Sequence, residues 1–138
     1  MPSKQRAIKG LAEIALRVND LNKMTRFYEE VIGLEILERF DKTVFFRIAE
    51  GVEGHVQVLA LFDRSGTKGY TGIDSKKSTI DHIAFGISKS DYESEMKRIE
   101  ALGYEVRTAY HEWVKWRSLY VTDPEGNTVE MVCYDAEE

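Results

Sequence analysis

The stretch IDHIAFGI at residues 80–87 is the main indication of the fold, because LAEIALRV at residues 11–18 repeats its pattern. His82 and Glu13 occupy matching places in the two stretches, 69 positions apart (82 − 13 = 69). Both stretches are rich in apolar and β-branched residues, which predicts β-strands. A pattern that recurs at a fixed offset indicates an internal structural repeat. We therefore expect the chain to fold as two related halves.

The residues after each predicted strand show the spacing of an amphipathic helix. Apolar side chains recur at helical intervals over 21–31 in the first half and over 92–102 in the second. Asp20 is the expected N-cap of the first helix, because its carboxylate can accept a hydrogen bond from a free backbone N–H group. Gly33 and Gly103 follow the two helices and suit left-handed C-terminal caps.

Three strand-like segments follow each helix. They cover 35–40, 43–48 and 55–62 in the first half, and 105–110, 117–122 and 128–134 in the second. The predicted fold class is α+β, with two βαβββ modules that are related by pseudo-two-fold symmetry and form a curled sheet around a central cavity. Within a single domain spanning 1–138, module 1 covers about 8–62 and module 2 about 79–134. The linker 63–78 is rich in Gly, Ser, Thr and Lys, and it is either a surface connection or a functional lid.

The composition is that of an ordinary globular protein. Among 138 residues, 43% are hydrophobic and 31% are charged, both close to average usage. No apolar run approaches the ~20 residues that span a bilayer. The polar, basic start lacks the apolar segment of a signal peptide, so a cytoplasmic location is expected. The net charge is −5 and the basic residues are scattered, which argues against binding to nucleic acid.

Cys133 is the one cysteine of the chain, so an intramolecular disulfide is excluded. It lies in the apolar run 129–134. A reactive thiol needs a basic and partly open setting, and the neighbouring sequence offers none. We therefore interpret Cys133 as a buried core residue and not as a nucleophile.

Four polar residues interrupt the apolar strands at positions that the repeat makes equivalent. Glu13 and His82 match in the first strands, and Gln57 and Glu130 match in the last strands at an offset of 73 (130 − 57 = 73). An unpaired polar group in an apolar setting costs several kcal/mol, so a partner is required. If the halves are related by a two-fold axis, all four side chains converge.

Two carboxylates, an imidazole and an amide oxygen suit Zn²⁺, Ni²⁺, Co²⁺, Mn²⁺ or Fe²⁺ in a five- or six-coordinate site. Two alternatives need no metal: an ion pair between Glu13 and His82, or a hydrogen-bonded core histidine. His55 lies two residues from Gln57 and is an alternative ligand from the first module.

From residue 8 to residue 134 the chain resembles the vicinal oxygen chelate superfamily. That group includes glyoxalase I, methylmalonyl-CoA epimerase, extradiol dioxygenases, and the fosfomycin- and bleomycin-resistance proteins. The motifs are VNDL at 18–21, FY at 27–28, GL at 33–34, DHIAF at 81–85, DPEGN at 123–127 and VE at 129–130. They are specific for the fold and much less specific for the reaction.

The resemblance implies one divalent metal ion per chain, held by Glu13, Gln57, His82 and Glu130. It implies a small substrate with adjacent oxygens and an enediolate- or enolate-like intermediate, with Glu130 and Glu13 as the catalytic groups of a lyase, isomerase or epimerase. In the family the position of Glu13 is often His or Gln, so this chain departs from the pattern there. Two alternatives are an extradiol-type dioxygenase, which would need a histidine in place of Glu13, and a metal-free small-molecule binding or resistance protein.

Three further residues are predicted as weaker substrate contacts: Arg117, Tyr120 and His111. Arg117 could bind a carboxylate or phosphate through its planar guanidinium. The alternative is that Arg117 is an exposed strand residue and Tyr120 a core residue, neither of which contacts a substrate. His111 lies near Trp113 and Trp116, in a predicted loop that either covers the site or forms a dimer contact. The family resemblance also favours a homodimer.

Overall fold

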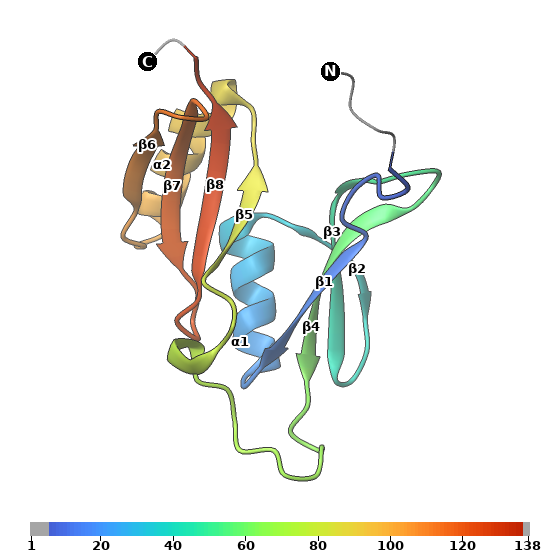
Figure 1. The fold of residues 1–138 in the computed structure, drawn as a ribbon. Helices are drawn as coiled ribbons and strands as arrows, with labels where there is room; N and C mark the ends of the chain where they lie inside the picture. Colours follow the sequence, from blue (N-terminus) through green and yellow to red (C-terminus); the bar gives the residue numbers. More distant parts are fainter. Residues whose placement is uncertain (1–5, 137–138) are drawn as a thin grey trace. The chain divides into compact units, whose positions relative to one another are not determined.

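The computed structural model describes residues 6–136 and contains two compact units, one ending at Ile73 and one starting at Asp74. Each unit has a four-stranded mixed sheet and one main helical segment, in the chain order strand, helix and three strands (Figure 1). The two predicted βαβββ modules are therefore confirmed, and each is described by itself below.

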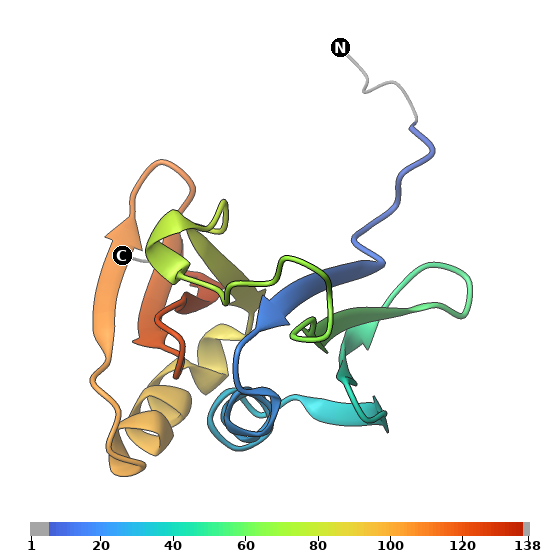
Figure 2. The same ribbon diagram turned by 90° about the horizontal axis from the view of Figure 1, so that it is seen from below.

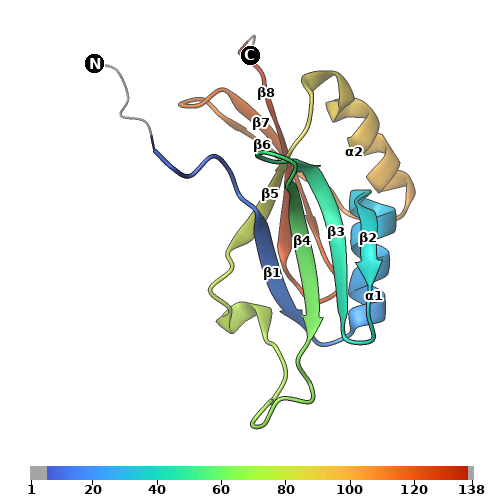
Figure 3. The same ribbon diagram turned by 90° about the vertical axis from the view of Figure 1, so that its right-hand side faces the viewer.

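The sheet of the first unit has the strand order β1-β4-β3-β2 (Figure 3). Strand β1 runs parallel to β4, and the other neighbours are antiparallel. The elements are β1 (Glu13–Val18), α1 (Leu21–Arg26), the π-helical η1 (Phe27–Ile32), β2 (Glu35–Arg39), β3 (Thr43–Glu50) and β4 (Val56–Asp63).

The first helix begins and ends where the sequence predicts. The Asp20 carboxylate accepts a hydrogen bond from the Lys23 N–H at 3.0 Å, and Gly33 closes the helix with φ +93°. The second half widens into a π-helix, in which the Gly33 N–H donates to the carbonyl of Tyr28 at 3.1 Å. Figure 2 looks along α1 and shows the helix against one face of its sheet. The buried hydrophobic side chains on the helix are Met24, Phe27, Tyr28, Val31 and Ile32.

The second unit has the strand order β5-β8-β7-β6, with β5 parallel to β8 (Figure 1). Its elements are the short η2 (Ser75–Lys77), β5 (His82–Gly86), η3 (Lys89–Asp91), α2 (Tyr92–Ala101), β6 (Arg107–His111), β7 (Trp116–Thr122) and β8 (Thr128–Tyr134). Leu102 was expected on the apolar face of the helix, but it lies at the C-cap of α2 and is exposed.

The two faces of this second sheet differ in character. One face packs under α2 and buries bulky apolar side chains: Ile83, Phe85, Leu119, Val121, Val129, Met131 and Cys133. The Tyr92 hydroxyl on α2 donates to the Ser118 carbonyl at 2.9 Å and ties the helix to β7. The other face, called here the open face, carries His82, Ala84, Gly86, Ser118, Tyr120 and Glu130, because side chains alternate along a strand.

The DPEGN turn between β7 and β8 is organised by Asp123. Its carboxylate accepts hydrogen bonds from the backbone N–H groups of Glu125 and Asn127, at 2.9 and 3.0 Å, and from the Asn127 side chain at 2.8 Å. Gly126 has φ +90°, and a Cβ at this position would lie 2.6 Å from the Ser75 hydroxyl. A larger residue here would therefore displace the Ser75 hydroxyl and would be strained at this positive φ.

Part of the predicted linker is held in place by Asn19. The Asn19 side chain donates to the Ile73 carbonyl and accepts from the Ile73 N–H, both at 2.7 Å, and it also accepts from the Tyr70 hydroxyl at 2.9 Å. These bonds tether the end of the linker to the start of α1. Whether the linker acts as a lid stays an open prediction.

Among residues 6–136, no helix combines the length and the apolar character needed to cross a membrane.

We expect Cys133 to be chemically inert in the folded protein. Its side chain is 2% exposed, and burial is the main cause that raises the pKa of its thiol, with the nearby Asp135 carboxylate adding to the effect. Labelling with a thiol reagent at pH 8 should be at least about 100-fold slower in native buffer than in denaturant, because the thiolate is the reacting form. Equal rates in the two solutions would show that the thiol is open.

Candidate metal centre

His82 and Glu130 come together on the open face of the second unit. His82 pairs in register with Thr128 of the neighbouring strand, so Glu130 lies two residues along on the same face. The His82 Nε2 atom is 3.2 Å from Glu130 Oε1. The imidazole is 43% exposed and the carboxylate only 5%. The pair therefore brings together two possible metal ligands, an exposed imidazole nitrogen and a buried carboxylate oxygen.

Each of these two side chains has a second partner that orients it. The Ser118 hydroxyl donates to Glu130 Oε2 at 2.5 Å, and Asp81 Oδ1 is 2.7 Å from His82 Nδ1. A proton on Nδ1 would bond Asp81 and leave the lone pair on Nε2. Partners of this kind commonly fix the orientation of metal-binding histidines and carboxylates.

The donor spacing fits a shared divalent cation. Nitrogen and oxygen ligands lie about 2.0 to 2.2 Å from such an ion, which places two neighbouring ligands about 3 Å apart. The observed 3.2 Å between His82 Nε2 and Glu130 Oε1 agrees with that value. Over residues 6–136, no group of three or more His, Cys, Asp or Glu side chains forms a complete metal cluster. The structure thus gathers two of the four predicted ligands at one point.

The strand register corrects the predicted role of Gln57. Ala84 pairs with Glu130 in the second unit, and the corresponding pair in the first unit is Ala15 with Ala60. Ala60 is therefore the equivalent of Glu130, at an offset of 70 (130 − 60 = 70), and the predicted equivalence of Gln57 is wrong. The two last strands, compared without their neighbours, align three residues out of register. Because three is an odd number, this error exchanges the two faces of β4.

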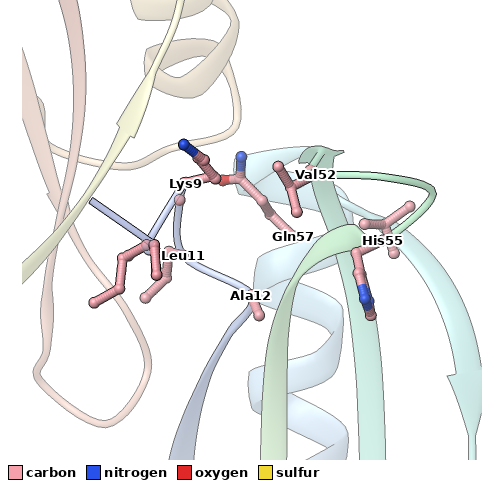
Figure 4. Close-up of a pocket in the computed structure, with 11 residues that line it drawn as sticks. Lys9, Leu11, Ala12, Val52, His55 and Gln57 are labelled. Atoms are coloured by element: carbon pink, nitrogen blue, oxygen red, sulfur yellow. The ribbon is translucent and has the colours of Figure 1, made fainter. Parts of the chain in front are cut away.

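Gln57 and His55 instead line a cavity of about 290 Å³ in the first unit. Its wall is mainly apolar and is built from the segment before β1 and the turn before β4 (Figure 4). The Gln57 side-chain NH₂ donates to the Glu50 carbonyl at 3.2 Å. Glu13 does not line this cavity, and its side chain lies on the opposite face of the sheet from Gln57, because it pairs with Val58.

The register supports the predicted match between Glu13 and His82. Each is the first residue of the first strand in its unit, and each is followed two residues later by an alanine, Ala15 or Ala84. The side chain of Glu13 is exposed. Small neighbours and solvent access leave room beside this carboxylate for a ligand.

Tyr120 and His111 also lie on the open face of the second unit. Tyr120 pairs in register with Glu130, and its hydroxyl is 2.9 Å from His111 Nε2. His111 is the last residue of β6 and not part of a loop, whereas Trp113 lies in the following turn and is 87% exposed. The imidazole thus holds the phenol hydroxyl on the face that carries Glu130.

Arg117 lies on the other face of the sheet, so the structure does not bring it to this site. It pairs in register with Cys133, and its Nε donates to Asp135 Oδ2 at 3.0 Å. Its guanidinium also stacks over the Tyr110 ring at 5.2 Å. Arg117 and Tyr120 are three residues apart on one strand, and strand alternation places such residues on opposite faces. Ser118 lies two residues from Tyr120 on β7 and therefore on the face of Glu130. Strand alternation could thus have predicted Ser118 as a partner of Glu130, a contact that was not predicted from the sequence.

The two-unit βαβββ fold, with a histidine–glutamate pair on the open face of one sheet, is that of a known protein superfamily. The model of the Glyoxalase/Bleomycin resistance protein/Dioxygenase superfamily matches residues 10–131, and the chain belongs to this superfamily. The fosfomycin resistance protein FosX of Listeria innocua is 31% identical over 127 residues, which cover 90% of this chain and 89% of that protein.

Solved structures agree with this assignment. A FosX variant from Listeria monocytogenes, in complex with Mn(II) and 1S,2S-dihydroxypropylphosphonic acid, has 28% identity and a TM-score of 0.69, with 94% of each chain covered. A lactoylglutathione lyase from Agrobacterium tumefaciens has 27% identity and a TM-score of 0.67, with 93% of this chain and 96% of that chain covered.

Replacing Ser118 by Ala is expected to weaken metal binding without removing a ligand. The change leaves the buried Glu130 Oε2 without its hydrogen-bond donor, which costs about 1 to 3 kcal/mol of stability. Loss of such an orienting partner typically lowers metal affinity about 10- to 100-fold. Ser94→Ala is the matched control, because that hydroxyl donates to the exposed Asp91 carbonyl just before α2. Equal metal affinity in both variants would contradict the prediction.

Proposed function

We propose that this chain is a divalent-metal-dependent enzyme acting on a small substrate with two adjacent oxygens, of the lyase, isomerase or epimerase type. The observation that carries the proposal is the His82–Glu130 pair, with its donors 3.2 Å apart and each side chain oriented by a separate partner. The likeness to a lactoylglutathione lyase supports the same proposal.

The proposed enzyme needs residues that bind the cation, move a proton and orient the substrate. His82 Nε2 and Glu130 Oε1 would hold the cation, which when bound supplies Lewis-acid polarisation of a substrate oxygen. Glu13, the register equivalent of His82, is the proposed ligand and proton-transfer group from the first unit. The Tyr120 hydroxyl, held by His111, would orient the substrate beside Glu130.

Metal content tests the first half of this proposal. Protein purified without chelator or affinity tag and incubated with Zn²⁺, Ni²⁺, Co²⁺, Mn²⁺ or Fe²⁺ should retain about one ion per chain, and His82→Ala should lose it. The metal-loaded parent should then form S-lactoylglutathione from methylglyoxal and glutathione without O₂. Strict dependence on O₂ would favour the dioxygenase alternative, and no metal in the parent would favour metal-free binding.

A second candidate function is modification of fosfomycin. It is favoured by the 31% identity to a FosX protein across 90% of this chain, and by the name of another relative, the glutathione transferase FosA of Serratia marcescens, which is 24% identical. Incubation of the Mn²⁺-loaded protein with fosfomycin, with and without glutathione, and detection by ³¹P NMR test this candidate. An unchanged ³¹P spectrum in both mixtures would exclude it.

A further inference from the structure

We propose that Arg107 is the specificity-determining residue of the open face, and that it selects substrates carrying an oxyanion such as a phosphonate, phosphate or carboxylate. This inference rests on the proposed function, because it names the substrate class of the same site. Arg107 is the first residue of β6, one of the two edge strands of the second sheet.

The strand register places Arg107 in one transverse row with the candidate metal ligand. Arg107 pairs with Tyr120 on β7, and Tyr120 pairs with Glu130 on β8. Residues paired in this way project from the same face of a sheet, and neighbouring strands are about 4.8 Å apart. The Arg107 side chain therefore leaves the sheet about two strand spacings from Glu130, with Tyr120 on the strand between them.

The charge of Arg107 is not used elsewhere in the described structure. Its side chain is exposed, and over residues 6–136 it takes part in none of the hydrogen bonds, ion pairs or ring contacts. Arg117 differs in this respect, because Asp135 and Tyr110 engage it on the other face. Among the strand residues of the open face, Arg107 alone carries a permanent positive charge.

This spacing defines the kind of molecule that fits. Two oxygens at the His82–Glu130 end and an anionic group a few bonds away would span the row from β8 to β6. A guanidinium binds such groups through two parallel N–H donors, which favours a planar or tetrahedral oxyanion. A neutral chelating molecule would use the His82–Glu130 end without touching Arg107.

A binding experiment with Mn²⁺-loaded protein can measure the contribution of Arg107 apart from that of the His82–Glu130 pair. Calorimetry would compare 1S,2S-dihydroxypropylphosphonic acid, which carries an anionic phosphonate beside its two hydroxyls, with acetohydroxamic acid, a two-oxygen chelator that has no second anionic group. Arg107→Ala should weaken phosphonate binding about 10- to 100-fold, the scale of a lost charge-assisted hydrogen bond. It should leave Mn²⁺ and hydroxamate affinity within about two-fold. Arg107→Lys should fall between, because it keeps the charge and loses the paired donors.

Lys97→Ala is the matched control, because it removes one exposed positive charge from α2, on the other side of the same sheet. An equal loss in this control would show a general charge effect and overturn the role of Arg107, as would an unchanged phosphonate affinity in Arg107→Ala. If the parent binds no metal, the same titration on metal-free protein decides the matter. Phosphonate binding that depends on Arg107 would then keep this inference and reject the metal, and absence of phosphonate binding would reject both.

Discussion

Replacing Glu130 by Gln should lower divalent-metal affinity by at least about 100-fold and abolish turnover, while the protein stays folded. The Glu130 carboxylate is 5% exposed and lies 3.2 Å from His82 Nε2. Gln has the same shape but is neutral, so the site loses its one buried anionic donor. Loss of an orienting partner alone costs about 10- to 100-fold in metal affinity, and loss of a ligand should cost more.

Folding should survive this change because the amide oxygen of Gln can still accept the Ser118 hydroxyl, now at 2.5 Å from Glu130 Oε2. The thermal midpoint is expected to stay within about 5 °C of the parent value. Calorimetric titration with Mn²⁺, paired with thermal unfolding of the same samples, would measure both effects. Glu100→Gln on the exposed side of α2 removes the same charge elsewhere and should change neither. Retention of parent-like metal affinity would remove Glu130 from the ligand set.

Local chemistry made much of the fold predictable from the sequence. The first helix starts at Asp20 and ends at Gly33 because the carboxylate cap and the left-handed glycine are properties of those residues alone. Strand β8 covers the predicted 128–134 for a similar reason, since the Asp123 turn fixes where it begins. The widening of the first helix into a π-helix has no signal that we can identify in the sequence.

The candidate site was predictable only where two strands carry clear patterns of their own. Glu130 and His82 interrupt strongly apolar strands, and the structure places their donors together. The last strands alone match Gln57 to Glu130, but the pairing of each last strand with the first strand of its unit matches Ala60 to Glu130. Pairing between distant strands fixes the register, and a shift by an odd number of residues exchanges the two faces. Arg107 carries no motif, and its relation to Glu130 emerges only from the register of three strands.

Replacing Glu13 by Gln should reduce turnover at least about 100-fold while metal affinity falls no more than about 10-fold. The expectation follows from assigning proton transfer to this carboxylate, because general acid–base groups contribute about 10²- to 10⁴-fold to rate. An amide oxygen or an imidazole nitrogen at this position could still bind a divalent cation. The side chain is exposed at the start of β1, and its loss should not disturb the core.

Glu13→His separates the two roles that this residue could have. If Glu13 moves a proton, both variants bind metal and neither turns over the substrate that the parent consumes. If Glu13 is only a ligand, Glu13→His keeps turnover near the parent level, and the proton must then be carried by another group, for which Glu130 is the next candidate. Glu29→Gln, an exposed change on η1, controls for the altered net charge. Steady-state kinetics and Mn²⁺ titration on the same preparations distinguish the two outcomes. Only if Glu13 moves a proton does Glu13→His bind metal and fail to turn over the substrate.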